Sequence, residues 1–379
     1  MRHAVVVVGP GLAADPALLD ETAGREFAAL GVRGTVAHAA DGAQFLAHVR
    51  AATSPDPATT PGGPGGERGR AVVVVPGPDP GARSLMTAAM GPVVWLDLAR
   101  VDDAEVGEGG SHLHGRGIEG LPWAIRHAVG RLAWPRRRVP YGPHRDQWAE
   151  LYLPRTPPGG SPPPVVALVH GGNWRSVWAA DLMDALALDL VRRGLAVWNL
   201  EYRRPDLHGW QATTADVAAG LRALDGLDVP VDRARTVLAG HSAGAQLVLR
   251  AAADGARASL VVSLAGMLDL VEAARRWLGA GAVAGALGAA PDEAAQVYGS
   301  ASPLHRLPIG VPQLVVQGTG DELDLVDFGR RYARAAQAAG DDVTFLEMSG
   351  DHFAVIDPRT PIWHATARAV LGETPDSPR

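Results

Sequence analysis

A serine between glycines stands at residues 240 to 244, which read Gly240-His241-Ser242-Ala243-Gly244. The pattern Gly-x-Ser-x-Gly lets a serine occupy a sharp bend between a strand and a helix, where its hydroxyl can attack a carbonyl. The apolar run TVLAG precedes Ser242, and the helix-forming run AGAQLVLRAAA follows it. We therefore predict that Ser242 is a nucleophile and not merely a small residue in a turn.

A serine nucleophile needs a base and an acid that orients the base. Asp321 lies in QGTGDELD, just after the apolar run QLVVQ, and His352 lies in SGDHFAVID, just after DVTFLEM. We predict that His352 takes and returns the proton while Asp321 holds its imidazole. The chain order Ser242, Asp321, His352 is that of an α/β-hydrolase triad.

Other residues compete for these two roles. Asp324 and Asp351 are the rival acids, but neighbouring side chains in an extended loop point apart, which favours Asp321. His241 stands next to the serine, and we expect the bend to aim it away, into packing. His364 is expected in the last helix.

Glycines also follow the apolar run PVVALV, in the stretch His170-Gly171-Gly172-Asn173-Trp174. They would let backbone N–H groups turn towards a substrate carbonyl. We expect Gly171, Gly172 and the N–H of Ala243 to form an oxyanion hole. The alternative is a plain glycine turn.

Several aromatic residues are expected near the mouth of this site. We expect Trp174 and Tyr202 to contact substrate, and the further candidates are Trp178, Trp210 and Trp277. Packing in the core is an equally good interpretation of each ring. Residues 267–308 could form a small helical lid, and no large cap insertion is visible, which favours a small, partly polar substrate.

Two successive alternations of strands and helices divide the chain into an expected domain 1–135 and an expected domain 136–379. Continuous apolar runs separated by amphipathic segments predict parallel sheets covered on both faces, hence the α/β class in both halves. The expected strands are 4–8, GVRGTVAH, 71–75 and PVVWLDL in the first half, and 164–170, 194–202, 236–240, 259–266, 313–318 and 342–348 in the second. Helices are expected at 16–30, 41–52, 81–90, 180–193, 213–225, 243–254 and 326–339. The segments 54–70 and 154–164, rich in Pro and Gly, predict exposed loops.

The second half resembles α/β-hydrolases of the bacterial esterase group over nearly all of residues 140–372. The motifs that carry the resemblance are YGPHRDQWAELYLP, HGGNWR, WNLEYRR, GHSAGAQL, QGTGDELD and GDHFAVIDP. The HGGNW box and the DHF ending also look like kynurenine formamidase. The resemblance implies hydrolysis of a small ester or amide, without choosing the acyl group.

The first half resembles type II dehydroquinase, a flavodoxin-like fold, in VVVVGPGLA, AVVVVPGPDPGARSLMTAAMGPVVWLDLARV and SHLHGRGIEGLPWAIRHAV. It departs from that family at the catalytic positions. No tyrosine follows the first strand, Asp97 stands where the family has a histidine, and the Asn-Pro-Gly box reads Val75-Pro76-Gly77. We therefore expect a domain without dehydratase activity that serves assembly, as in a homo-oligomer, or ligand binding.

Composition limits the partners and cofactors. All 35 basic residues are arginine, yet 41 acidic residues give a net charge of −6, so no nucleic acid partner is expected. Arg136-Arg137-Arg138 is interpreted as the solvated end of a helix. The chain has no cysteine, and its first apolar run is too short for a signal peptide or a membrane span. We expect a cytoplasmic protein that does not associate with a membrane.

No cofactor or metal is expected. Residues 9–14 fit a loose dinucleotide pattern, but Pro10 removes an amide from the turn and no acidic residue ends the second strand. His112 and His114 lack an evident third ligand and are interpreted as loop histidines. Two alternatives to a serine hydrolase stay open: a scaffold protein with an inactive hydrolase fold, and a bifunctional protein of aromatic metabolism with a ligand-binding first domain.

Overall fold

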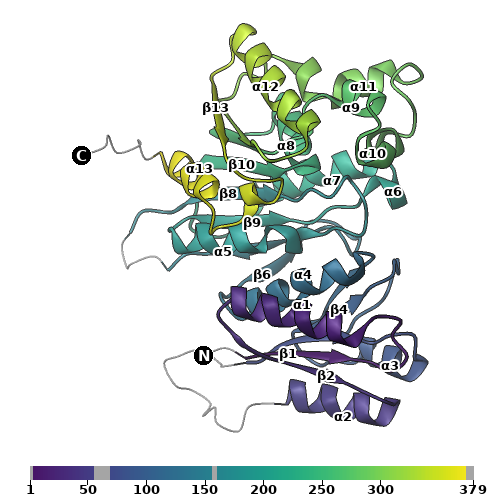
Figure 1. Cartoon of the computed structure of the whole chain (residues 1–379). Coiled ribbons are helices and arrows are strands. Elements are labelled where there is room, and N and C mark those ends of the chain that lie inside the picture. Colours follow the sequence, from purple (N-terminus) through teal and green to yellow (C-terminus); the bar gives the residue numbers. More distant parts are fainter. Residues whose placement is uncertain (1–2, 55–68, 156–159, 373–379) are drawn as a thin grey trace. The chain divides into compact units, whose positions relative to one another are not determined.

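The computed structural model describes residues 3–54, 69–155 and 160–372 (Figure 1). The chain divides into two compact units, Met1–Pro135 and Arg136–Arg379, here called the N-terminal and C-terminal units. Residues 55–68 of the first expected loop and residues 156–159 of the second lie outside the described residues. None of the helices in the described ranges is both long enough and apolar enough to cross a membrane.

The N-terminal unit contains a five-stranded parallel sheet in the order β2-β1-β3-β4-β5. This is the strand order of flavodoxin-like folds, so the predicted fold class is confirmed for this unit. The strands are β1 (His3–Val8), β2 (Arg33–His38), β3 (Ala71–Val75), β4 (Val93–Asp97) and β5 (Ser111–His114). The helices are α1 (Pro16–Ala29), α2 (Gly42–Thr53), α3 (Pro80–Ser84) and α4 (Gly120–Arg131), with short 3₁₀ turns at Leu85–Thr87 and Gly117–Glu119.

Helices cover both faces of this sheet, because alternate residues of a strand point to opposite sides. Val6 packs in one hydrophobic cluster with Leu19 of α1 and Leu121 of α4. Its neighbour Val7 packs in another cluster with Phe45 of α2. The continuous valine runs are therefore buried on both faces, as the sequence pattern predicts.

The C-terminal unit contains an eight-stranded mixed sheet in the order β13-β12-β11-β10-β8-β9-β7-β6. The strands are β6 (Arg137–Pro140), β7 (Trp148–Tyr152), β8 (Pro164–Val169), β9 (Ala196–Leu200), β10 (Asp232–His241), β11 (Leu260–Leu264), β12 (Gln313–Gly318) and β13 (Val343–Met348). Six strands from β8 onward are parallel, whereas β7 is antiparallel to β9 and β6 is antiparallel to β7.

The antiparallel pair β6 and β7 corrects one expectation. Arg136 to Arg138 do not end a helix: Arg137 and Arg138 belong to strand β6. Arg136 is nearly buried and pairs with Glu150 across a 3.2 Å contact from Nε to Oε2. A run of arginines predicts exposure, but the buried carboxylate comes from the neighbouring strand, which the local pattern does not reveal.

Helices also cover both faces of the second sheet. In β9, Trp198 donates its indole N–H to the Gly220 carbonyl of α7, whereas Asn199, on the opposite face, donates to the Ala180 carbonyl at the start of the α5 region. Trp363 of α13 bonds to Asp189 of α5, so α5 and α13 lie together. The helices are α5 (Asp184–Arg192), α6 (Pro205–His208), α7 (Trp210–Ala223), α8 (Ala243–Ala253), α9 (Leu270–Arg275), α10 (Leu278–Leu287), α11 (Ala295–Ala301), α12 (Leu323–Ala338) and α13 (Pro361–Leu371).

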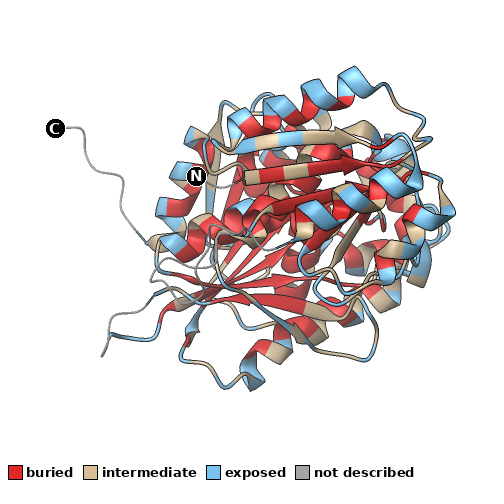
Figure 2. Cartoon of the chain, turned by 90° about the horizontal axis from the view of Figure 1, so that it is seen from below, coloured by how far each residue is buried: buried red, intermediate tan, exposed pale blue. Residues whose placement is uncertain are grey.

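The inner strands of both sheets are largely buried, the outermost strands β2, β6 and β13 are partly exposed, and the helices expose one side (Figure 2). Short 3₁₀ turns complete the second unit at Ala180–Met183, Leu224–Gly226, Pro303–Arg306 and Ala354–Ile356. The expected helical segment 267–308 contains α9, α10 and α11. His364 lies in α13, as predicted.

Candidate active site

The three residues proposed for catalysis follow three parallel strands of the second sheet. Ser242 comes directly after β10, Asp321 three residues after β12, and His352 four residues after β13. The carboxyl ends of parallel strands meet at one edge of a sheet, and ligands of open α/β sheets bind there. The topology therefore brings the three side chains to the same edge.

Ser242 occupies a strained bend between β10 and α8, with φ 53° and ψ −118°. Positive φ is costly for a residue with a side chain, about 1–3 kcal/mol, and is tolerated where surrounding structure imposes it. Both glycines of the motif permit this bend. A Cβ on Gly240 would lie 2.2 Å from the Gly244 oxygen, and one on Gly244 would lie 2.1 Å from the Val169 oxygen.

Asp321 and His352 are joined by a hydrogen bond of 2.9 Å from imidazole Nδ1 to carboxylate Oδ2. The Asp321 side chain is fully buried, and it also accepts from the Gln317 amide and the Glu322 backbone N–H. Because a carboxylate accepts, Nδ1 carries the proton and the neutral ring has its lone pair on Nε2. That is the tautomer a general base requires.

The rival acids have other partners. Asp324 pairs with Arg276 at 2.7 Å, and Asp351 accepts from the backbone N–H groups of Phe353 and Ala354. The structure thus places Asp321, of these three carboxylates, on the imidazole of His352.

His241 contacts His352 directly. Its Nε2 donates to the His352 carbonyl oxygen at 3.0 Å, and the two ring centroids are 4.7 Å apart. Burial, with a smaller effect of His352, lowers the pKa of His241 well below its usual range. His241 is therefore neutral and structural, which agrees with the packing role expected for it.

Ser242 and His352, the residues proposed to react together, are not hydrogen-bonded to each other in this structure. Among the described residues, no hydrogen bond joins the Ser242 hydroxyl to His352. Catalytic hydrogen bonds are often long without substrate and tighten in the complex. The absence of this bond is therefore compatible with the proposed triad.

The glycine loop after β8 lies against the serine. A Cβ on Gly171 would be 2.9 Å from Ser242 Cβ and 2.5 Å from the His241 oxygen, so only glycine fits. Gly172, with φ 108°, begins a run of three residues of positive φ. The amide of Ala243 begins α8, where first-turn N–H groups have no acceptor inside the helix. Backbone donors from both segments thus come next to Ser242.

A buried ion cluster holds this loop in place. His170 Nε2 lies 3.2 Å from Glu201 Oε1, and the other Glu201 oxygen accepts from the Ala180 N–H. Burial would raise the pKa of Glu201, but Arg204 and then His170 more than offset it, so the pKa falls well below its usual range. Sequence analysis included His170 and Glu201 in motifs without assigning them this role.

Trp174 and Tyr202 are buried, which favours packing in the core over the expected contact with substrate for both. Tyr202 is fully buried, stacks on His170 at 4.4 Å, and donates to the His170 carbonyl. Trp174 is 1% exposed and donates its indole N–H to Gln246 of α8. Both rings anchor the glycine loop, because their polar atoms find partners in the core.

Other apolar side chains are exposed near the proposed triad. Phe353 is adjacent to His352, with ring centroids 5.5 Å apart, and is 42% exposed. Leu323, two residues after Asp321, is 82% exposed. Trp277, expected near the mouth, is 68% exposed and follows Arg276, which pairs with Asp324. Sequence analysis overlooked Phe353 and Leu323, although each adjoins a proposed catalytic residue.

One group of side chains at this edge has metal-ligand chemistry. Ligand atoms of His144, Asp146 and His208 all lie within 4.8 Å of one another. Protein groups already use part of their capacity, since the Asp146 N–H donates to His144 Nδ1 and Arg204 lies 3.4 Å from Asp146. This group was not predicted from the sequence, because its first and last members, His144 and His208, are 64 positions apart.

The N-terminal unit gathers a different polar cluster at the end of β4. Asp97 accepts from Arg83 in two hydrogen bonds, of 2.6 and 3.0 Å, and lies 2.9 Å from His112 Nε2. Burial would raise the pKa of Asp97, but His112 and Arg83 outweigh it and lower the pKa to about 2. His114 stacks on His112 at 5.1 Å, and its Nδ1 accepts the Val101 N–H.

Comparison with known proteins connects the second unit to a fold. The family model BD-FAE matches residues 149–328. A truncated carbohydrate esterase from gut microbiota is 18% identical with a TM-score of 0.55, covering 62% of this chain and 94% of its own. A tributyrin phosphonate complex of esterase B from Lactobacillus rhamnosis is also 18% identical, with a TM-score of 0.56 over 67% of this chain and 90% of its own.

The C-terminal unit has the α/β-hydrolase fold. A bacterial heroin esterase adds to this evidence, at 19% identity and a TM-score of 0.53 over 63% of this chain and 82% of its own. Among curated proteins, none matches this sequence. The predicted fold class is thereby confirmed for the C-terminal unit. From here on it is called the hydrolase unit, after its fold alone.

Proposed function

We propose that the hydrolase unit is a serine carboxylesterase that forms an acyl-enzyme on Ser242. The observation that carries the proposal is the hydrogen bond of 2.9 Å from His352 to Asp321, at the sheet edge where Ser242 occupies a strained bend. The similar structures named as esterases support an ester as the substrate class.

In the proposed mechanism, Ser242 Oγ attacks the ester carbonyl carbon while its proton passes to His352 Nε2. The oxyanion that forms accepts hydrogen bonds from the N–H of Ala243 and from the loop at Gly171 and Gly172, and the positive end of α8 favours this charge. The C–O bond to the alcohol then breaks, and His352 protonates the alcohol as it leaves. Water repeats the sequence on the acyl-enzyme, releasing the acid and restoring Ser242.

Substrate selectivity is proposed from the exposed side chains near the triad. Phe353 and Leu323 would contact an apolar part of the ester, because each adjoins a triad residue and is open to solvent. A small ester with an apolar acyl or alcohol group fits this surface best.

The decisive experiment compares hydrolysis of p-nitrophenyl butyrate by the intact protein and by Ser242→Ala. We expect the variant to lose about 10⁶-fold in kcat, as when a serine nucleophile is removed elsewhere. Ser263→Ala is the matched control, since Ser263 is a buried serine on β11 whose hydroxyl has no hydrogen-bond partner within the described residues. Equal rates for Ser242→Ala and the intact protein would reject the proposal.

A second candidate is an arylformamidase, on the strength of the His170 to Trp174 box and the Asp351-His352-Phe353 ending. Phe353 is the observation that favours it, because an exposed aromatic ring beside His352 could stack on a flat acyl-bearing ring. Turnover of N-formylkynurenine much faster than that of the ester would select this candidate. No turnover of either substrate, together with no fluorophosphonate labelling of Ser242, would leave a scaffold protein.

For the N-terminal unit we propose a role in assembly as a homo-oligomer, without dehydratase chemistry. Asp97 stands where the dehydroquinase-like pattern has a histidine. Its carboxylate is already bound to Arg83 and His112, so it is not available as a base.

A further inference from the structure

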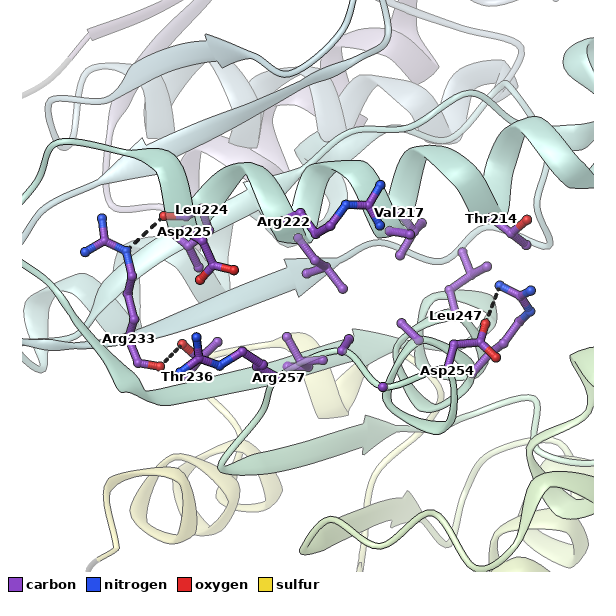
Figure 3. A pocket seen from close by; sticks show the side chains of 17 residues that line it. Thr214, Val217, Arg222, Leu224, Asp225, Arg233, Thr236, Leu247, Asp254 and Arg257 are labelled. Carbon is purple, nitrogen blue, oxygen red and sulfur yellow. Dashed lines mark hydrogen bonds and ion pairs between the residues drawn. The ribbon is translucent and has the colours of Figure 1, made fainter.

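A groove of about 340 Å³ lies between α7, the first half of β10 and the end of α8 (Figure 3). Ligand pockets for small molecules occupy roughly 300–1,000 Å³. The turn that follows α8, at Gly255 to Arg257, closes one side. The groove therefore has the size of a small-molecule site.

The groove is separate from the proposed catalytic site. Thr236 and Leu238 of β10 line it, but Ser242 and the glycine loop do not. Ser242 follows Thr236 by six residues, which corresponds to about 20 Å along an extended strand. A ligand in the groove would thus not contact Ser242.

Its floor is apolar. Four leucines, one valine and small residues provide it, and the leucines and the valine are buried or nearly so: Val217, Leu221, Leu224, Leu238, Leu247 and Ala251. An apolar ligand body would remove this surface from water at about 25 cal/mol for each Å² buried.

Its rim is basic. Four arginines and two aspartates line the groove, namely Arg222, Arg233, Arg250, Arg257, Asp225 and Asp254. Figure 3 shows Arg233 and Arg257 towards one end and Asp254 towards the other. The positive charges exceed the negative ones, although the chain as a whole carries a net charge of −6. The rim is therefore unlike the average surface of this protein.

The four arginines differ in what they bind. Arg250 pairs with Asp254 at 3.1 Å, and Arg306 neutralises the same aspartate at 2.8 Å. Arg233 donates to the backbone carbonyls of Leu224 and Leu227. For Arg222 and Arg257, both exposed, no hydrogen bond or ion pair to another described residue is found.

We infer that this groove binds a small amphipathic carboxylate, whose apolar body lies on the leucine floor and whose charge is attracted by the guanidinium groups of Arg222 and Arg257. Arginine suits this role, because its planar fork matches a carboxylate in two hydrogen bonds. Asp225 also lines the groove and opposes an anion, so the arginines must outweigh its charge. The site is independent of the proposed esterase activity.

The test uses octanoate as the probe, with the intact protein and hydrogen exchange followed by mass spectrometry. We expect octanoate to slow exchange in residues 214–225 and 247–257. Acetate, which lacks the apolar body, and octan-1-ol, which lacks the charge, should each bind at least about tenfold more weakly. Equal binding of octanoate and octan-1-ol would overturn the assigned role of the arginines.

Two variants make the result decisive. Arg222→Glu with Arg257→Glu should weaken octanoate binding by about tenfold or more, because both charges are reversed. Arg334→Glu, on α12 and outside the groove, is the matched control and should leave binding unchanged. Ala218→Phe should fill the groove and abolish protection. Absence of protection in the intact protein at millimolar octanoate, or full protection in either groove variant, would overturn the inference.

Discussion

Ser242 shows how one residue can be held in an unfavourable conformation by its neighbours. Its backbone N–H donates to the Leu264 oxygen at 2.8 Å, and its carbonyl accepts from the amides of Ala245 and Met267. The partners belong to α8, to the last residue of β11 and to the segment after β11. The bend is therefore imposed by two adjacent elements, which keep the hydroxyl at the sheet edge.

Asp321 provides the first prediction at this scale. Asp321→Asn preserves the size of the side chain, but it removes the charge that stabilises the imidazolium and the acceptor that selects the tautomer. We expect kcat on p-nitrophenyl butyrate to fall about 10⁴-fold, while the circular dichroism spectrum is unchanged. Asp324→Asn is the matched control, because that carboxylate binds Arg276 instead, and it should lose little activity. A larger loss in the control would assign the orienting role to Asp324.

Sequence reasoning at the residue scale identified Ser242, Asp321 and His352 as candidates because each follows a buried apolar strand in a loop. For Trp174 and Tyr202 it left substrate contact and core packing both open, and their burial favours packing. The acceptors that hold these rings, Gln246 and the His170 carbonyl, lie 72 and 32 positions away. Residue type predicts that a ring is useful, but only tertiary packing decides whether it faces substrate or the core.

At the scale of elements, most strands and helices were predictable because their apolar patterns are strong. The hairpin of β6 and β7 was not, since RRVP at Arg137–Pro140 has too few apolar residues to predict a strand. It forms because pairing with β7 satisfies its backbone, and because Arg138 stacks on Trp148 with its guanidinium carbon 3.8 Å from the ring centroid. Non-local pairing thus overrides the local pattern.

The end of β5 carries a prediction about pH. Burial, with a smaller effect of His112, lowers the pKa of His114 to about 4. The unfolded chain binds a proton at this residue near pH 6.5, whereas the folded unit does so only near pH 4. Stability of the N-terminal unit should therefore be complete above pH 6.5 and fall as the pH falls from 6.5 to 4, by less than about 3 kcal/mol, because solvent screens this partly buried ring.

The variant His114→Asn tests this dependence, because asparagine can still accept the Val101 N–H but cannot become a cation. Hydrogen exchange of peptides covering β3 and β4, corrected for the intrinsic rate, should lose less protection between pH 6.5 and 4 than in the unaltered protein. His48→Asn, on α2, serves as the control. An unchanged pH dependence in His114→Asn would contradict the assignment.

At the scale of the whole molecule, each unit has hydrophobic clusters made of its own residues. The buried residues of the main cluster in the hydrolase unit lie between Ala149 and Ala336. The two clusters of the N-terminal unit lie between Ala4 and Leu132. Domains with their own cores commonly fold alone. We therefore expect each unit to fold when the chain is divided after residue 135.

A chain of residues 136–379 should fold and hydrolyse p-nitrophenyl butyrate with a kcat within about twofold of the intact protein, since the proposed triad and oxyanion loop lie within it. Sedimentation of both chains tests the assembly role proposed for the first unit: a smaller assembly for residues 136–379 supports it, and an unchanged one contradicts it. Loss of activity in a soluble, folded fragment would show that the first unit contributes to catalysis.

The outermost strands of the eight-stranded sheet have a consequence for solubility. A strand at a sheet edge offers unpaired amide and carbonyl groups on which another chain can add, and natural proteins discourage this with charge and proline. β6 is short, carries Arg137 and Arg138, and ends at Pro140, which has no N–H to donate. On the other edge, β13 presents Glu347, paired with Arg330. Both edges are thus protected against the strand addition that begins fibrous aggregation.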